Sequence, residues 1–311
     1  MRQEPPFSPE EVQALSVTTS PSSGKSYGVE RVCAVWKQSR SNYYAHLSPS
    51  PEKVTSLGKR GPKTDLSDDA LLTLIREDLK ASPFQGEGHR KVWARLRFGK
   101  GIKVSRKRIL RLMRDAHLLS PHRTRRGEGK AHDGEIRTTA PNVMWGTDGT
   151  KIFTVQDGWV WLFTAVEHWN AECVGWRVCK IGDRFNALQP LAMALTEVYA
   201  SVKAGAARGL SLRMDNGTQY LSEHFQNQVK FWGIEPSFAF VEQPQTNGVT
   251  ERFNRTIKEQ AVRGRVFQTI EEVREAVGNF IRQYNEQWRV EKIAFMTPRE
   301  ARDQWSSRMT A

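Results

Sequence analysis

Three carboxylates of the chain, Asp148, Asp215 and Glu251, are of the residue type that metal-dependent chemistry requires. Carboxylate oxygens are ligands that Mg²⁺ prefers, and this ion is often held by a few carboxylates together with substrate phosphates. A pair of such ions can activate an attacking water or 3′-hydroxyl and stabilise the leaving oxygen in phosphodiester chemistry. Taken together, the three side chains predict a metal site for chemistry of this kind.

Each carboxylate also has a simpler interpretation when it is taken alone. Asp148 lies in an apolar strand pattern, where a bare carboxylate is costly, so it could be a buried hydrogen-bond partner. Asp215 could cap a turn, because an Asn-Gly pair follows it. Glu251 shares a helical face with Arg255 and Lys258, which is typical of a solvated surface laced with ion pairs. The metal hypothesis therefore rests on the three residues together.

A scaffold of strands and helices must hold these carboxylates. Alternation and turn residues predict five strands, at 142–154, 159–166, 173–179, 210–215 and 235–241. Helical spacing predicts helices at 184–199, 222–232 and 269–288, and another that begins after the loop 243–248 and buries Val249, Phe253, Ile257 and Ala261. Three antiparallel strands followed by alternating helix and strand indicate an α/β domain with a mixed sheet.

A basic helical region precedes these strands. Helices are expected at 67–80 and 88–98, and a third begins after a glycine-containing turn and carries Arg106, Lys107 and Arg111. Two helices joined by a short turn, the second heavily basic, are typical of a helix-turn-helix that contacts DNA. A basic surface helix in a small bundle is the alternative.

The first 64 residues carry a weaker pattern. Residues 1–25 carry Pro, Ser, Thr and Gly with little periodicity and are expected to be a flexible arm, and 48–64 have the composition of a linker. Between them, 27–47 contain a short helical pattern, then Ser39 followed by an arginine and two tyrosines. A helix starting there could face DNA, and a small helical hairpin with ordinary packing is an equally good interpretation.

Composition narrows the class of protein. The 311 residues carry a formal net charge of +13, which favours an acidic polymer as partner, and 38% hydrophobic residues with ten tryptophans favour folded cores. No run of about 18 apolar residues occurs, so we expect no membrane span, and the first residues lack the apolar core of a secretory signal. Three cysteines without CxxC spacing disfavour a disulfide framework and a zinc site and favour a reducing cytosol.

The motifs around the carboxylates resemble those of a known family. Trp145-Gly-Thr-Asp148, Asp215-Asn-Gly-Thr-Gln-Tyr220 and Gln245-Thr-Asn-Gly-Val-Thr-Glu251 follow in this order, with 35 residues between the second and third carboxylates. This arrangement resembles the D,D-35-E signature of retroviral integrases and of the OrfB transposases of bacterial insertion sequences. Residues 88–114 resemble the helix-turn-helix that precedes the catalytic core in those transposases, and Tyr284-Asn285 and Thr297-Pro298 resemble their tail.

The resemblance implies a fold and an activity. The fold would be a ribonuclease H-like α/β core, with a mixed five-stranded sheet and flanking helices, preceded by a small all-α helix-turn-helix region. The activity would be that of a transposase that nicks the ends of an insertion sequence and joins the freed 3′-hydroxyl to target DNA. Asp148, Asp215 and Glu251 would hold two Mg²⁺ ions, for which Mn²⁺ can substitute. Further DNA contacts would come from Asn254, Arg255 and Lys258.

The resemblance also implies partners and a division of the chain. We expect DNA as partner, a homo-oligomer on DNA, an upstream-frame product as a further partner, and a bacterial cytoplasmic, nucleoid-associated location. The expected parts are 1–64 (arm, helical segment and linker), 65–120 (helix-turn-helix), 121–140 (basic linker), 141–265 (catalytic core) and 266–311 (C-terminal helical extension). Two alternatives remain: a nuclease acting on RNA hybrids, and a catalytically inactive DNA-binding protein or repressor derived from a transposase.

Overall fold

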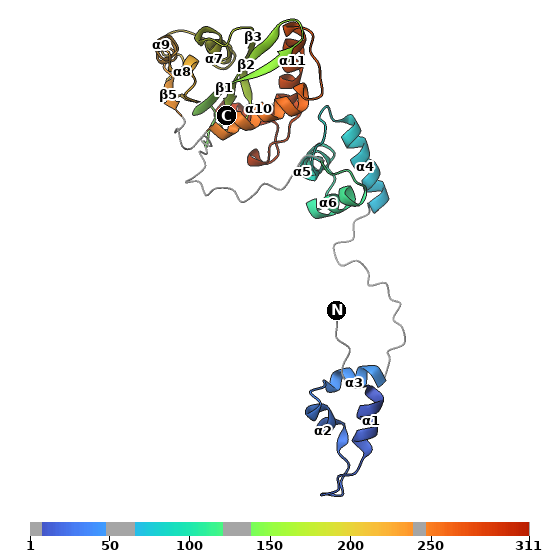
Figure 1. Cartoon of the computed structure of the whole chain (residues 1–311). Helices are drawn as coiled ribbons and strands as arrows, with labels where there is room; N and C mark the ends of the chain where they lie inside the picture. Colours follow the sequence, from blue (N-terminus) through green and yellow to red (C-terminus); the bar gives the residue numbers. More distant parts are fainter. Residues whose placement is uncertain (1–7, 48–65, 121–137, 239–246, 311) are drawn as a thin grey trace. The chain divides into compact units, whose positions relative to one another are not determined.

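The computed structural model describes residues 8–47, 66–120, 138–238 and 247–310. The chain divides into two compact units, Met1–Thr64 and Asp65–Ala311 (Figure 1). The expected linker 48–64, most of the expected basic linker and the loop before Asn247 lie outside the described residues. No helix in the described ranges combines the length and the apolar character needed to cross a membrane.

The first unit contains three short helices, α1 (Pro9–Val17), α2 (Gly28–Val35) and α3 (Arg40–Leu47). Helix α1 corrects the expectation of a flexible arm for the described residues 8–25, and residues 1–7 of the expected arm lie outside the described residues. Its start is defined by a capping box, in which Ser8 and Glu11 exchange side-chain and backbone hydrogen bonds. This signal was present in the sequence, but α1 buries only two residues, so its periodicity is weak. The two helices expected within 27–47 are confirmed as α2 and α3.

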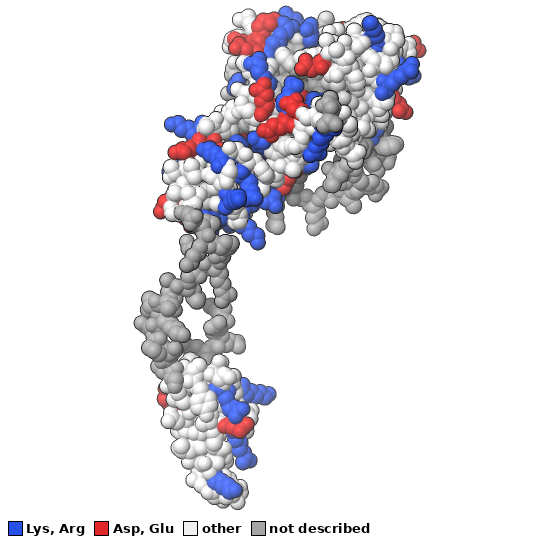
Figure 2. Space-filling view, turned by 180° about the vertical axis from the view of Figure 1, so that it is seen from behind, with Lys and Arg blue, Asp and Glu red and all other residues white. Residues whose placement is uncertain are grey.

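The second unit begins with the expected three-helix region. It comprises α4 (Asp68–Ala81), α5 (His89–Ala94) continued by the π-helical turn η1 (Arg95–Gly99), and α6 (Arg106–Asp115). Ser67 and Ser105 cap α4 and α6 with their side chains, which accept hydrogen bonds from the backbone N–H groups of Ala70 and Arg108. The apolar stripes of the three helices form one core, with Leu71, Ile75, Val92, Leu96, Ile109 and Met113 fully buried. Figure 2 shows the face of the larger unit seen from behind, with Lys and Arg gathered on it and Asp and Glu among them.

The larger part of the second unit is a five-stranded mixed sheet, as predicted. Its strands lie in the order β3-β2-β1-β4-β5, and the first three form an antiparallel meander to which β4 and β5 add in parallel with β1. The strand bounds are β1 (Met144–Thr154), β2 (Gly158–Glu167), β3 (Cys173–Cys179), β4 (Ser211–Met214) and β5 (Glu235–Phe238). The parallel strands place the end of β4 beside β1, which is where Asp215 follows.

Helices cover both faces of this sheet (Figure 1). On one face, α7 (Arg184–Tyr199), α8 (Thr218–Leu221) and α9 (Glu223–Phe231) pack with Trp145 and Phe163. On the other, α10 (Gly248–Ile257), the π-helical turn η3 (Lys258–Val262) and α11 (Ile270–Gln287) pack with Ile152 and Leu162. Neighbouring residues of one strand point to opposite faces, so β1 and β2 contribute to both cores.

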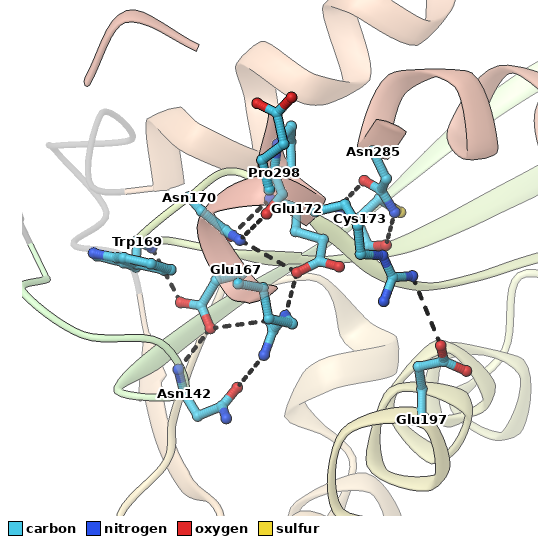
Figure 3. Close-up of polar contacts among 12 residues, drawn as sticks. Asn142, Glu167, Trp169, Asn170, Glu172, Cys173, Glu197, Asn285 and Pro298 are labelled. Atoms are coloured by element: carbon cyan, nitrogen blue, oxygen red, sulfur yellow. Dashed lines mark hydrogen bonds and ion pairs between the residues drawn. The ribbon is translucent and has the colours of Figure 1, made fainter. Parts of the chain in front are cut away.

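The last part of the expected C-terminal extension, which contains η4 (Glu291–Ile293) and α12 (Pro298–Thr310), is attached to β2 through a buried polar network (Figure 3). Glu167 at the end of β2 accepts hydrogen bonds from the backbone N–H of Asn142 at 2.7 Å and from Nε1 of Trp145 at 3.1 Å. Arg302 of α12 forms an ion pair with Glu172 and lies 3.8 Å from Glu167. These contacts join α12 to the beginning of β1 as well as to β2.

The tail residues that resemble the family belong to the same attachment. Asn285 of α11 exchanges two hydrogen bonds with the backbone of Cys173, of 3.0 and 2.9 Å (Figure 3). The Nδ2 atom of Asn170 donates to the carbonyl of Pro298 at 2.9 Å. Asn285 and Pro298, one residue from each tail motif, therefore have structural roles that depend on backbone hydrogen bonding.

Candidate active site

Asp148 lies in the middle of β1, opposite Thr164 of β2, on the face covered by α10. Its Oδ2 accepts a hydrogen bond from Nδ2 of Asn254 at 2.8 Å, and its Oδ1 accepts one from the backbone N–H of Gly149 at 2.8 Å. Burial raises the pKa of Asp148, and the nearby charges of Asp215 and Glu251 raise this pKa further. Neither hydrogen-bond donor carries a charge, so a cation beside Asp148 would compensate the carboxylate.

Glu251 lies in the first turn of α10 and is exposed, while Phe253 and Ile257 of the same helix are buried against α11. The predicted apolar stripe therefore turns the polar side of α10 toward Asp148. Between them is an open pocket of about 270 Å³, lined by Asp148, Thr150, Glu251, Asn254, Arg255, Lys258 and Arg263. Tertiary packing has brought two of the three predicted carboxylates into one pocket.

Asp215 follows the last residue of β4 and does not line this pocket. It is exposed, and its Oδ1 accepts the backbone N–H of Gly217 at 3.0 Å, which is the turn-capping geometry considered from the sequence. Its charge nevertheless reaches Asp148 and contributes to the raised pKa there. Across the described ranges, no three acidic, histidine or cysteine side chains stand close enough to enclose a metal ion.

The chemistry of this set of donors fits Mg²⁺. The predicted ligands are all carboxylate oxygens, and Mg²⁺ usually keeps several waters and takes one or two carboxylates together with substrate phosphates. A complete protein cage is therefore not needed. Asp148 and Glu251 face a shared pocket whose remaining charged residues are cations suited to phosphate. The residues present match an open site that is completed by a phosphate-bearing substrate.

Asn254, which was expected to contact DNA, is mostly buried beside Asp148. It is 5% exposed and lies between two strands' side chains, accepting a hydrogen bond from Oγ1 of Thr164 at 3.0 Å while donating to Asp148. The expected DNA contact stays a prediction, and in the structure this buried amide holds and orients the carboxylate of Asp148. Its distance of 106 residues from Asp148 in sequence explains why the pattern alone did not reveal this role.

Three cations line the pocket, and one of them was missed. Arg255 and Lys258 were expected from the helical stripe that contains Glu251, and both are exposed. Arg263 joins them because the π-helical turn at the end of α10 inserts one residue; its N–H bonds to the carbonyl of Lys258 at 2.7 Å, five residues back. With regular α-helical spacing, Val262 and not Arg263 would follow Arg255 and Lys258 on the face of α10 that contains Glu251. Such π turns often occur at functional sites.

A buried polar cluster beneath β1 was also missed. A Cβ at Gly146 would lie 2.1 Å from Oγ1 of Thr250, 2.7 Å from Oδ1 of Asn247 and 2.8 Å from Nε2 of His168. All three polar residues are less than 5% exposed. The start of α10 therefore approaches β1 to a distance that only a glycine allows, and this approach sets the position of Glu251. The Gly-Thr-Asp motif contained the signal, but only contacts between distant segments give it meaning.

The predicted DNA-binding residues of α6 are exposed on the side away from its buried Ile109 and Met113. Lys107 and Arg106 lie on this surface, and Arg106 is 3.4 Å from Glu291. Arg111 forms an ion pair of 2.7 Å with Asp68, and hydrogen bonds from Arg111 and Arg108 lower the pKa of Asp68 to about 2.

Comparisons with known proteins agree with this arrangement. Two family models described as "Integrase core domain" match residues 138–244 and 232–298, and a model described as "HTH-like domain" matches 67–126. The two core matches together span the sheet, the pocket and the beginning of the tail. The chain thus contains an integrase core domain, built on the mixed sheet, and an HTH-like domain that precedes it.

Relatives place the chain within that class. It is 24% identical over 249 residues to the insertion element IS2A uncharacterized 48.2 kDa protein of Escherichia coli, covering 78% of this chain and 57% of the relative. It is also 24% identical over 241 residues to transposase InsD of insertion element IS2 of E. coli. This match covers 75% of this chain and 77% of InsD. The chain therefore carries an integrase core domain and an HTH-like domain and is similar to transposases of insertion elements.

Solved structures that are similar to this one include the catalytic core domains of two retroviral integrases. The BIV integrase core has a TM-score of 0.40 and 21% identity, covering 55% of this chain and 99% of that one. The magnesium complex of the HTLV-2 integrase core has a TM-score of 0.37 and 17% identity, and the match covers 49% of this chain and 90% of that one.

Proposed function

We propose that this chain is a DNA transposase that nicks the ends of an insertion sequence and joins the 3′-hydroxyl to target DNA by metal-dependent transesterification. The observation that carries the proposal is the shared pocket, which is lined by the carboxylates of Asp148 and Glu251 together with the cations of Arg255, Lys258 and Arg263. Carboxylates and cations in one pocket suit a phosphodiester that is bound through divalent ions and through direct ion pairs.

Asp148, Asp215 and Glu251 would hold the ions, Mg²⁺ or Mn²⁺. Bound there, two such ions would activate the attacking hydroxyl and stabilise the leaving oxygen. The chain's own residues supply the positioning. Asn254 keeps the carboxylate of Asp148 directed into the pocket through its 2.8 Å hydrogen bond.

The surrounding cations complete the proposed site. Arg255, Lys258 and Arg263 would bind phosphates on either side of the scissile bond, because guanidinium and ammonium groups form charge-assisted hydrogen bonds with phosphate oxygens. Arg106 and Lys107 of α6 would hold the DNA end in the helix-turn-helix region. We propose the working parts as 65–120 for end binding, 141–265 for catalysis and 266–311 for support of the sheet, with 121–140 linking the first two. We further propose a homo-oligomer on paired ends, and assembly with an upstream-frame product where the element encodes one.

Labelled DNA ends from the sequences that flank the gene provide the test. Wild-type protein with Mg²⁺ should nick these ends and join the labelled 3′-end to a plasmid, and Asp215→Asn should do neither while binding the ends as well as wild type. Joining that survives in Asp215→Asn would contradict the proposed role of this residue. Nicking without joining, with a preference for RNA hybrids, would support the nuclease alternative. DNA binding without any cleavage by wild type would support the repressor alternative.

A further inference from the structure

The first unit has the organisation of a separate small domain. Its helices α1, α2 and α3 enclose a core of Val12, Val32, Cys33 and Tyr43. The helix-turn-helix family match begins only at residue 67, so it does not reach these helices. The sequence left two interpretations open for residues 27–47, a DNA-facing helix and a plain helical hairpin. The side chains on the third helix distinguish them.

Helices α2 and α3 are joined by a tight turn of four residues, Trp36–Ser39. Lys37 adopts the left-handed conformation with φ of 53°, and the N–H of Gln38 bonds to the carbonyl of Cys33 at 2.8 Å, which closes the end of α2. The chain then enters α3 directly, with the N–H of Tyr43 bonded to the carbonyl of Ser39 at 3.1 Å. A short turn of this length between two helices is the connection of a helix-turn-helix.

Helix α3 is held by one side chain and exposes the rest. Tyr43 is 6% exposed and belongs to the core of the unit, whereas the other seven residues of α3 are exposed. The exposed polar residues are Arg40, Ser41, Asn42, Tyr44 and His46. Arg and Asn are the side chains that make paired hydrogen bonds to guanine and adenine in the major groove, and Ser and Tyr often bind phosphates. The helix contains no acidic residue that phosphates would repel.

We propose that residues 8–47 form a second DNA-binding unit, in which α3 enters the major groove and reads bases through Arg40 and Asn42. The ion pair of Arg40 with Glu30, at 3.2 Å, does not oppose this, because both side chains are more than half exposed and such pairs exchange readily. Duplex DNA is favoured over a protein partner because the exposed face is built mainly from hydrogen-bonding groups. The proposal requires no catalytic activity and stands independently of the proposed transposition chemistry.

The experiment uses the full chain and a pool of random-sequence 40-base-pair duplexes, selected by binding in the presence of EDTA. Wild type should enrich a motif of two parts, one for each DNA-binding unit. The double variant Arg40→Ala/Asn42→Ala should lose one part and keep the other, and should bind the full motif about 10- to 100-fold more weakly, in line with two lost base contacts. Gln13→Ala, an exposed polar change on α1, is the matched control and should select the wild-type motif.

Thermal unfolding followed by circular dichroism verifies that the double variant keeps its helices, and Asn42→Asp provides a second variant that places a repelling charge on α3. Both α3 variants should select the same shortened motif, and Asp215→Asn should select the wild-type motif whether or not the proposed catalysis is correct. An unchanged motif and affinity in the double variant would overturn the proposal. So would unchanged DNA selection together with weaker self-association in sedimentation, which would assign α3 to a contact between copies of the chain.

Discussion

Asn254 on α10 donates its Nδ2 hydrogen to Oδ2 of Asp148 on β1 across 2.8 Å, and thereby ties the helix that carries Glu251 to the strand that carries Asp148. The amide has only one suitable orientation, because Oγ1 of Thr164 donates to its oxygen at 3.0 Å. Three segments from different parts of the chain thus determine the direction of one carboxylate. Residues that orient metal ligands in this way usually matter nearly as much as the ligands.

Replacing this amide should weaken the site without unfolding the protein. We expect Asn254→Ala to lower strand transfer about 10- to 100-fold and to raise the Mg²⁺ concentration needed for half-maximal activity. Strand-transfer assays over a Mg²⁺ titration measure both effects. Asn227→Ala, at an exposed asparagine of α9, is the matched control. An unchanged Mg²⁺ requirement in Asn254→Ala would contradict a role of this amide in the proposed metal site.

The π-helical turn makes a specific prediction about Arg263. Arg263→Ala should weaken DNA binding at the pocket and reduce the dependence of log K on log salt by about one unit, as expected for one lost phosphate contact. Arg265→Ala, two residues further and equally exposed but outside the pocket lining, should change binding less. Fluorescence anisotropy at several salt concentrations compares them. Equal effects of the two substitutions would mean that the cations act only through overall charge.

Gly146 should tolerate no side chain. Gly146→Ala places a methyl group 2.1 Å from Oγ1 of Thr250, and β1 cannot move away because it pairs with β2 and β4. Overpacking of this kind typically costs about 1–3 kcal/mol of unfolding free energy, which urea denaturation measures. Gly248→Ala, at the start of the same helix where the space is open, should leave stability unchanged or slightly raised. Equal stability of Gly146→Ala and wild type would show that α10 can retreat from β1 without penalty.

Because His168 is buried, we expect the stability of the folded protein to depend on pH. Burial, together with the positive charges of Lys292 and Arg213, lowers the pKa of His168 to about 4. In the unfolded chain the imidazole of His168 is protonated near pH 6.5, whereas in the folded chain it is protonated only near pH 4. The stability that neutral His168 contributes is therefore complete above pH 6.5, and it falls as the pH drops toward 4. The loss from this residue has a limiting slope of about 1.4 kcal/mol per pH unit.

The comparison of wild type with His168→Gln isolates that contribution. Urea unfolding at pH 7.5, 5.5 and 4.5 should show a smaller decrease of unfolding free energy in the variant, because glutamine takes up no proton. Parallel pH profiles for the two proteins would contradict a buried neutral imidazole at this position.

Arg302 should be essential for the attachment of α12. Arg302→Met removes the cation that faces Glu167 and Glu172, both buried, and leaving buried carboxylates without their partner typically costs about 3–5 kcal/mol. Arg299→Met breaks an exposed pair with Glu197 at 3.9 Å and should cost less than about 1 kcal/mol. Urea denaturation of both variants provides the measurement. A small and equal cost for the two would place the strength of the attachment elsewhere.

Much of this protein follows from local sequence signals. Alternating apolar residues and an Asp-Gly turn determine the β1–β2 hairpin, serine caps mark the starts of α4 and α6, and four-residue apolar steps determine which face of α10 is buried. These signals suffice because they act between residues that are near one another in the chain. They therefore suffice to predict the mixed sheet, the helices around it and the elements that carry the three carboxylates.

Tertiary structure alone decided how those elements meet. Asn254 became a support for Asp148 because α10 crosses β1 at that point, and Gly146 became indispensable because the same crossing brings Thr250 against it. Arg263 entered the pocket through a π turn, which changes helical register by one residue and follows no apolar period. Each of these depends on packing between segments about 100 residues apart or on a local departure from regular geometry. Neither leaves a periodic trace in the sequence, and so only the fold reveals them.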